Sequence, residues 1–154
     1  MDASKVRAIY DAHTRDLMWA LCLNDWQIDV GTEKLGDGIR GECNAQYEYR
    51  RAKITLDPGE FKKDSDVLEV LFHELVHVAL AAYRMPHNLA FKLTRTEDAE
   101  SSIQESFRNA DELAVKQIMY ALEVGMDLSI KKIAALGAKA RDGMKPAKKK
   151  KKKR

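Results

Sequence analysis

The chain lacks several features that would take it out of the ordinary globular class. Its 154 residues include two cysteines, Cys22 and Cys43, and neither lies in a CxxC pair, so neither a disulfide framework nor a thiolate pair for zinc or redox work is predicted. We expect both to be buried small hydrophobic residues. No apolar run approaches the roughly 20 residues that span a bilayer, and the N-terminus lacks the apolar stretch of a signal peptide. The sequence therefore predicts a cytoplasmic protein with no membrane partner.

Acidic residues are absent from the last ten positions, where eight of the side chains are basic. Residues 1–144 hold 19 basic and 24 acidic side chains, so the body is net negative although the whole chain has a formal charge of +3. A segment that repels itself and has nothing apolar to bury is expected to be disordered, which predicts a disordered lysine-rich tail at 143–154. Lys148–Arg154 could contact nucleic acid nonspecifically through its phosphates, and a merely solubilising tail is the alternative.

The remaining 142 residues fit one domain that mixes helices and strands. Apolar spacing predicts helices at residues 4–23, 67–83, 97–123 and 128–140 and short strands at 26–30, 39–49 and 52–56. Asp66 and Glu69 resemble a capping box at the start of the second helix. We expect an α+β fold over 1–142, with a small antiparallel or mixed sheet of about three strands, most simply a meander, packed on the helices.

One helix carries the chemistry. His73, Glu74 and His77 form the pattern His-Glu-x-x-His within the helix predicted at 67–83. Residues four apart share a helix face, so both imidazoles can bind one metal ion. Glu74 emerges about 100° around the helix from His73, which suits it to hold the attacking water. Zinc lowers the pKa of a bound water to about 7, and a neighbouring carboxylate can take that proton and pass it to the leaving amine. The motif predicts Zn²⁺ as cofactor and peptide hydrolysis as the reaction.

The run Leu-Phe-His-Glu-Leu-Val-His-Val at residues 71–78 resembles the zincin metallopeptidases. The chain is most similar to the compact gluzincin-like proteins of bacteria and their phages, and the resemblance covers about residues 26–123. It is not similar to the metzincins, because Leu80 and Tyr83 stand where that class has Gly and a third His. The resemblance implies that His73 and His77 bind zinc, that Glu74 is the general base, and that a carboxylate from a later helix completes the site.

Several residues could supply that third ligand. The gluzincin-like pattern places Asp or Asn four residues after the ligand, and Glu105 followed by Asn109 matches it, so the resemblance implies Glu105 as ligand with Asn109 hydrogen-bonded to a zinc histidine. Glu112 lies further along the same helix face and is an alternative, and Glu100 is another. Residues 87–91, His-Asn-Leu-Ala-Phe, are similar to the His-Gly-x-x-Phe element of SprT-like and Spartan proteases, which makes His87 a competing ligand.

Together these features predict a zinc-dependent metallopeptidase with a zincin-like fold, in which Glu74 acts as general base and then general acid on a peptide or protein substrate. The alternative is a non-catalytic zinc-binding regulatory or DNA-associated module with the same fold. Zincins commonly bind an extended peptide against an edge strand, a form of β-augmentation. Residues 47–49 and 52–56 are the two segments considered for that strand, and the sequence does not choose between them.

Overall fold

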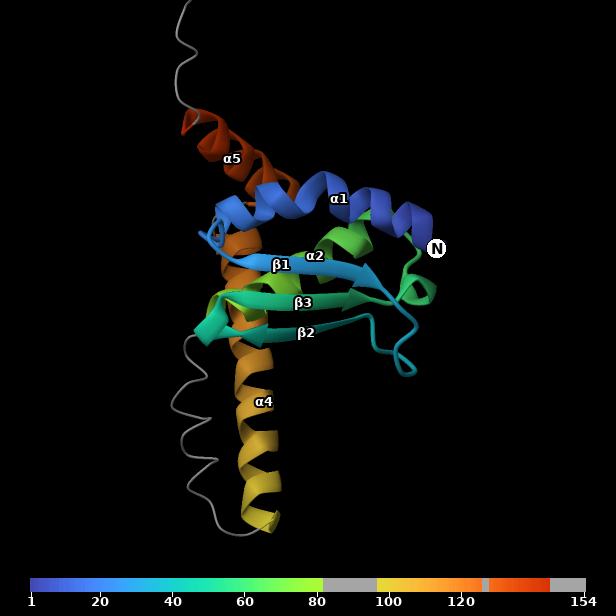
Figure 1. Ribbon diagram of the computed structural model, residues 1–154, viewed down its shortest axis with the longest axis vertical. Helices are drawn as coiled ribbons and strands as arrows, with labels where there is room; N and C mark the ends of the chain where they lie inside the picture. The colour runs from blue at the N-terminus through green and yellow to red at the C-terminus, as the bar shows by residue number, and fades with distance from the viewer. Residues whose placement is uncertain (82–96, 126–127, 145–154) are drawn as a thin grey trace, which may run out of the picture.

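The sheet of this protein has three strands in a mixed arrangement (Figure 1), and the computed structural model describes residues 1–81, 97–125 and 128–144. The strands are β1 (Gln27–Thr32), β2 (Gly41–Gln46) and β3 (Arg51–Leu56), in the spatial order β1-β3-β2. β2 and β3 form an antiparallel hairpin around the short turn η1 (Tyr47–Tyr49), and β1 runs parallel to β3. The α+β class and the mixed sheet are confirmed, and the simple meander is wrong because β1 pairs with the third strand instead of the second.

The central position of β3 follows from its composition. Ala52, Ile54 and Leu56 are at most 5% exposed, Arg51 and Lys53 are exposed, and Thr55 near the end of the strand is buried as well. The first half of the strand therefore alternates between the core and water, and its last three residues are buried on both faces. A strand with many apolar residues buries more apolar surface when it has a neighbouring strand on each edge, which favours the central position for β3.

Four long helices accompany the sheet in the described part of the chain: α1 (Ala3–Ala20), α2 (Asp64–Leu80), α4 (Glu97–Tyr120) and α5 (Ile130–Gly143). The short turn η2 (Pro58–Glu60) precedes α2, and the π-turn η4 (Ala121–Gly125) continues α4. All four correspond to helices that the apolar spacing predicts. Asp2 caps α1, because its carboxylate accepts hydrogen bonds from the backbone N–H and the hydroxyl of Ser4 at 2.7 and 2.8 Å.

Helix α2 begins three residues earlier than the sequence predicts. Asp66 does not stand before the helix but inside its first turn, where Oδ2 accepts from the backbone N–H groups of Lys62 and Lys63 at 3.2 and 3.1 Å. The expected capping box at Asp66 and Glu69 is therefore wrong by one turn. The helix is buried along most of its length, between the sheet on one side and α1 and α4 on the others.

The packing of α5 on α1 depends on a residue without a side chain. A Cβ at Gly137 would lie 1.7 Å from the backbone oxygen of Asp16, so the two helices cross in direct backbone contact. Arg141, one turn later, forms an ion pair with the Asp16 carboxylate at 2.6 Å. At the other end of the molecule the first half of α4 extends past the sheet (Figure 1), and its side chains from Gln104 to Ala110 are exposed.

Two sequence predictions fall outside the described residues, namely that for His87 and that for residues 145–154 of the tail expected at 143–154. The first two residues of that tail are described, and they form the end of α5 (Gly143) and its C-cap (Met144). None of the described helices is both long and apolar enough to cross a membrane. The expectation of two buried thiols is wrong for Cys22, which is exposed in a left-handed turn with φ 57° after α1. Cys43 is partly buried against the core.

Candidate metal centre

Helix α2 directs two imidazoles to one point. His73 and His77 are one turn apart, and their Nε2 atoms lie 3.1 Å from each other with the rings in an edge-to-face arrangement. The His77 side chain is 6% exposed and that of His73 is 22% exposed. The apolar residues around them, among them Phe72, Val76 and Val78, are buried in the core and hold the helix in place. The histidines therefore lie at the edge of the core, with their ring nitrogens directed to a shared site.

Helix α4 brings a carboxylate to the same point. Glu112 Oε2 lies 3.3 Å from His73 Nε2, and Glu112 Oε1 lies 3.2 Å from His77 Nε2. One ligand atom from each of the three residues lies within 4.8 Å of the other two. Two neutral nitrogen donors and one carboxylate form a ligand set of the kind that catalytic zinc sites use, which leaves a fourth position for water or substrate.

The spacing of these atoms fits a zinc ion. Bonds of about 2.0–2.1 Å in a tetrahedral arrangement separate neighbouring ligand atoms by roughly 3.4 Å. The closest separations among the three side chains are 3.1, 3.2 and 3.3 Å, the last two measured to different oxygens of Glu112, and one ligand atom from each residue lies within 4.8 Å of the others. Side-chain adjustment toward the shared point would bring one oxygen of Glu112 and the two nitrogens to ligand distance.

A second carboxylate orients one of the imidazoles. Asp111 Oδ2 lies 3.0 Å from His77 Nδ1, and the Asp111 side chain is 21% exposed. A carboxylate at this position accepts a hydrogen bond from the Nδ1–H group, so it favours the tautomer of His77 that presents the lone pair of Nε2 to the site. Adjacent residues of α4 thus have different roles. Asp111 orients the imidazole of His77, and Glu112 faces the point to which the Nε2 atoms of both histidines are directed.

The electrostatic environment keeps His73 neutral. Burial lowers the pKa of His73 below its usual 6.5, and repulsion from His77 lowers it further, while the Glu112 carboxylate acts in the opposite direction. A neutral imidazole is the form that binds a metal ion. His73 is therefore in its metal-binding form at neutral pH.

Glu74 lies between the two histidines in sequence and is 6% exposed. Its side chain packs against the start of β2, where a Cβ at Gly41 would lie 2.9 Å from Glu74 Oε1 and 3.3 Å from Glu74 Cγ. The absence of a side chain at Gly41 lets the strand approach α2 closely enough to hold the carboxylate in place. A buried carboxylate that follows a candidate metal ligand directly in sequence is a candidate general base.

The structure brings His73 and His77 together as the motif predicts, but it joins them with Glu112 and not with Glu105. Glu105 is exposed and lies seven residues, or about 10.5 Å along the helix axis, before Glu112. Asn109 is also exposed. The hydrogen bond to a zinc histidine that was expected of Asn109 is made by Asp111 instead. Lys116, not Asp or Asn, stands four residues after Glu112.

Other candidate ligands are not placed. The side chain of Glu100 and all of His87 lie outside the described part of the chain. Comparisons of the chain with protein-family models, with curated proteins and with solved structures gave no match in any of the three. A function for this protein therefore has to be inferred from the arrangement of its side chains.

Proposed function

We propose that the protein is a zinc-dependent metallopeptidase with a zincin-like fold, in which His73, His77 and Glu112 hold the ion and Glu74 is the general base. The observation that carries the proposal is the convergence of the His73 and His77 Nε2 atoms and the Glu112 carboxylate within 4.8 Å, with the His-Glu-x-x-His glutamate buried on the same helix as the two histidines. Two helices far apart in sequence supply these donors, so the cluster is a product of the fold and not of local sequence alone.

Zinc bound by these residues would polarise the substrate carbonyl and lower the pKa of a water molecule to about 7. The chain itself has to move the proton. Glu74 takes it from the attacking water and then donates it to the leaving amine, so that one carboxylate serves as base and as acid. Asp111 keeps the proton of His77 on Nδ1, so His77 Nε2 stays a ligand throughout.

The sheet offers a place for an extended substrate. In the order β1-β3-β2, strand β2 is an outer strand, and it is the strand that packs most closely on α2 beside Glu74. Of the two segments considered from the sequence, 47–49 forms η1 and 52–56 belongs to the central strand β3, so neither is an edge strand. We place the substrate backbone along β2, as in β-augmentation.

The test is zinc content measured by mass spectrometry together with cleavage of casein. Wild-type protein is expected to hold one zinc per chain and to cut casein. Glu112→Gln should lose most of the zinc, whereas Glu105→Gln, seven residues away on the same helix face, is the matched control and should keep both properties. Glu74→Gln should keep the zinc and lose the cleavage.

The other outcomes are equally informative. Zinc that survives Glu112→Gln but not His87→Ala would move the third ligand to His87 and refute the assignment of Glu112. Zinc bound by wild type through His73, His77 and Glu112, without cleavage of any substrate, would favour the non-catalytic regulatory or DNA-associated module instead.

A further inference from the structure

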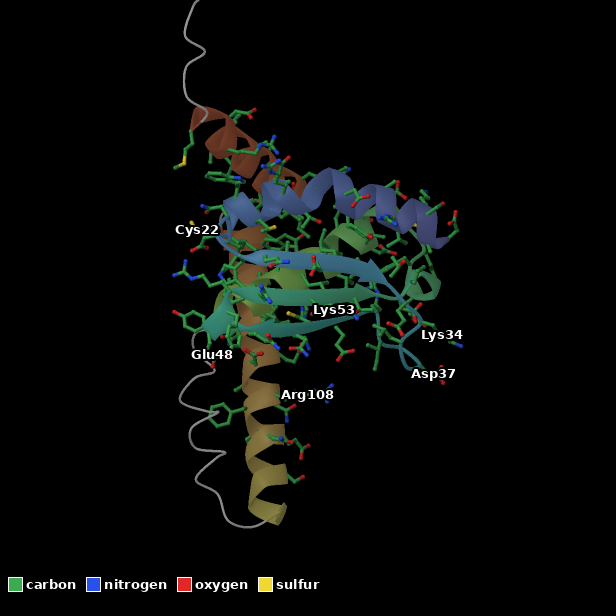
Figure 2. The ribbon with its side chains drawn as sticks, viewed as in Figure 1. Cys22, Lys34, Asp37, Glu48, Lys53 and Arg108 are labelled. Carbon is green, nitrogen blue, oxygen red and sulfur yellow. The ribbon has the colours of Figure 1, made fainter. Side chains whose placement is uncertain are left out.

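Two cations lie on either side of the candidate metal ligand on α4. Arg108 is four residues before Glu112 and Lys116 is four residues after it, so the three side chains share one face of the helix at intervals of about 6 Å. Arg108 and Lys116 are both exposed. Figure 2 shows Arg108 standing out from α4 on the part of the helix that extends past the sheet.

Neither cation is neutralised by the part of the protein that the structure describes. On a helix an exposed cation ordinarily pairs with a carboxylate three or four residues away, which is Glu105, Asp111 or Glu112 for Arg108 and Glu112 for Lys116. Both Glu112 oxygens are instead within 3.3 Å of the imidazoles, and Asp111 is hydrogen-bonded to His77. No ion pair of Arg108 or Lys116 is found among the described residues. The histidines therefore engage Glu112, the carboxylate that lies one turn from both cations.

The position of these charges is unusual for this chain. Residues 1–144 carry five more acidic than basic side chains, so two cations that have no ion pair with any described residue do not reflect the general charge of the body. A negatively charged group that approaches Glu112 would meet positive charge on both sides.

On the basis of the proposed function, we propose that Arg108 and Lys116 determine the specificity of the site and select polypeptides with acidic side chains next to the bond that is cut. They do not hold the metal or take part in proton transfer. They attract the substrate and orient it, and their effect on encounter should fall as salt screens exposed charges.

The experiment measures binding apart from cleavage. Zinc-loaded Glu74→Gln protein, which is expected not to cut, is titrated into three fluorescein-labelled decapeptides that differ only in two central residues, both Glu, both Gln or both Lys. Fluorescence anisotropy gives each Kd. The same titrations are run with Arg108→Gln, Lys116→Gln and the double substitution added, and with Lys139→Gln, an exposed cation of α5, as the matched control.

Exposed ion pairs contribute up to about fivefold in affinity, so each cation should contribute roughly threefold and the two together about tenfold. The Glu peptide should bind about tenfold more tightly than the Gln peptide, and the double substitution should remove this difference without changing zinc content. Lys139→Gln should preserve it. Equal affinity for the Glu and Gln peptides, or a preference that survives the double substitution, would overturn the inference.

The two proposals fail in different ways. If wild type cuts none of the three peptides and no casein, the peptidase function is wrong, and the anisotropy titrations still decide whether the two cations bind acidic peptides. If wild type cuts all three peptides at the same rate and binds them equally, the peptidase function stands and the role of Arg108 and Lys116 is wrong.

Discussion

Substitution of Gly41 by alanine should impair catalysis and leave metal binding unchanged. A Cβ at this residue would lie 2.6 Å from Val70 Cγ1 and 2.9 Å from Glu74 Oε1. To reach an ordinary contact of 3.4 Å, the two side chains of α2 would have to retreat by about 0.8 and 0.5 Å from these positions. Neither clash involves His73, His77 or Glu112.

The expected cost follows from these distances. A misplacement of 1 Å in a catalytic group can lower the rate about 100-fold, so half of that displacement at Glu74 should lower kcat about tenfold, or roughly 1.4 kcal/mol in the barrier. Overpacking against Val70 should also reduce the free energy of unfolding by about 1–3 kcal/mol. Zinc affinity should stay within about twofold of wild type because the ligands keep their positions.

The assay compares Gly41→Ala with Gly31→Ala, a strand glycine of β1 where a Cβ would meet nothing within 4 Å. Both proteins are loaded with zinc, checked by mass spectrometry, and assayed on the same peptide. Gly31→Ala should keep the wild-type kcat. If Gly41→Ala binds zinc fully and retains the wild-type kcat, the inference that β2 positions Glu74 for catalysis is refuted.

Three further predictions concern packing, ligand orientation and pH. Gly137→Ala gains about 1 kcal/mol in helix propensity, but its Cβ would lie 1.7 Å from a backbone oxygen of α1. Thermal denaturation should therefore show a net loss of stability of at least about 2 kcal/mol. Gly143→Ala in the same helix has open space around its Cβ and should be neutral or stabilising. Asp111→Asn should weaken zinc binding about 10- to 100-fold in a competition titration with a chelator, and unchanged affinity would show that the hydrogen bond to the imidazole is dispensable. The pKa of His73 is lower in the folded than in the unfolded protein, so the unfolded state binds the proton first as the pH falls. The free energy of unfolding of the metal-free protein should therefore decrease below pH 6.5, by at most about 1.4 kcal/mol per pH unit. Urea titrations of His73→Gln should show a shallower decrease.

The sequence by itself determined the elements and half of the site. Helix and strand periodicities are local, so the positions of the four long helices and three strands follow from the order of apolar residues. The same is true of His73, Glu74 and His77, because a spacing of four on one helix brings two imidazoles together whatever the rest of the chain does. These features needed no knowledge of which elements meet.

The tertiary structure decided which strand is central and which carboxylate completes the site. Glu105 and Glu112 are seven residues apart, nearly two full turns, so they lie on the same face of α4 and helical periodicity does not distinguish them. Only the point at which α4 crosses α2 places Glu112 within 3.3 Å of the imidazoles and leaves Glu105 in the exposed half of the helix. The adjacent pair Asp111 and Glu112 was a usable signal, since two neighbouring carboxylates at a helix crossing can reach both nitrogens of one ring, but the crossing itself depends on long-range packing of buried side chains.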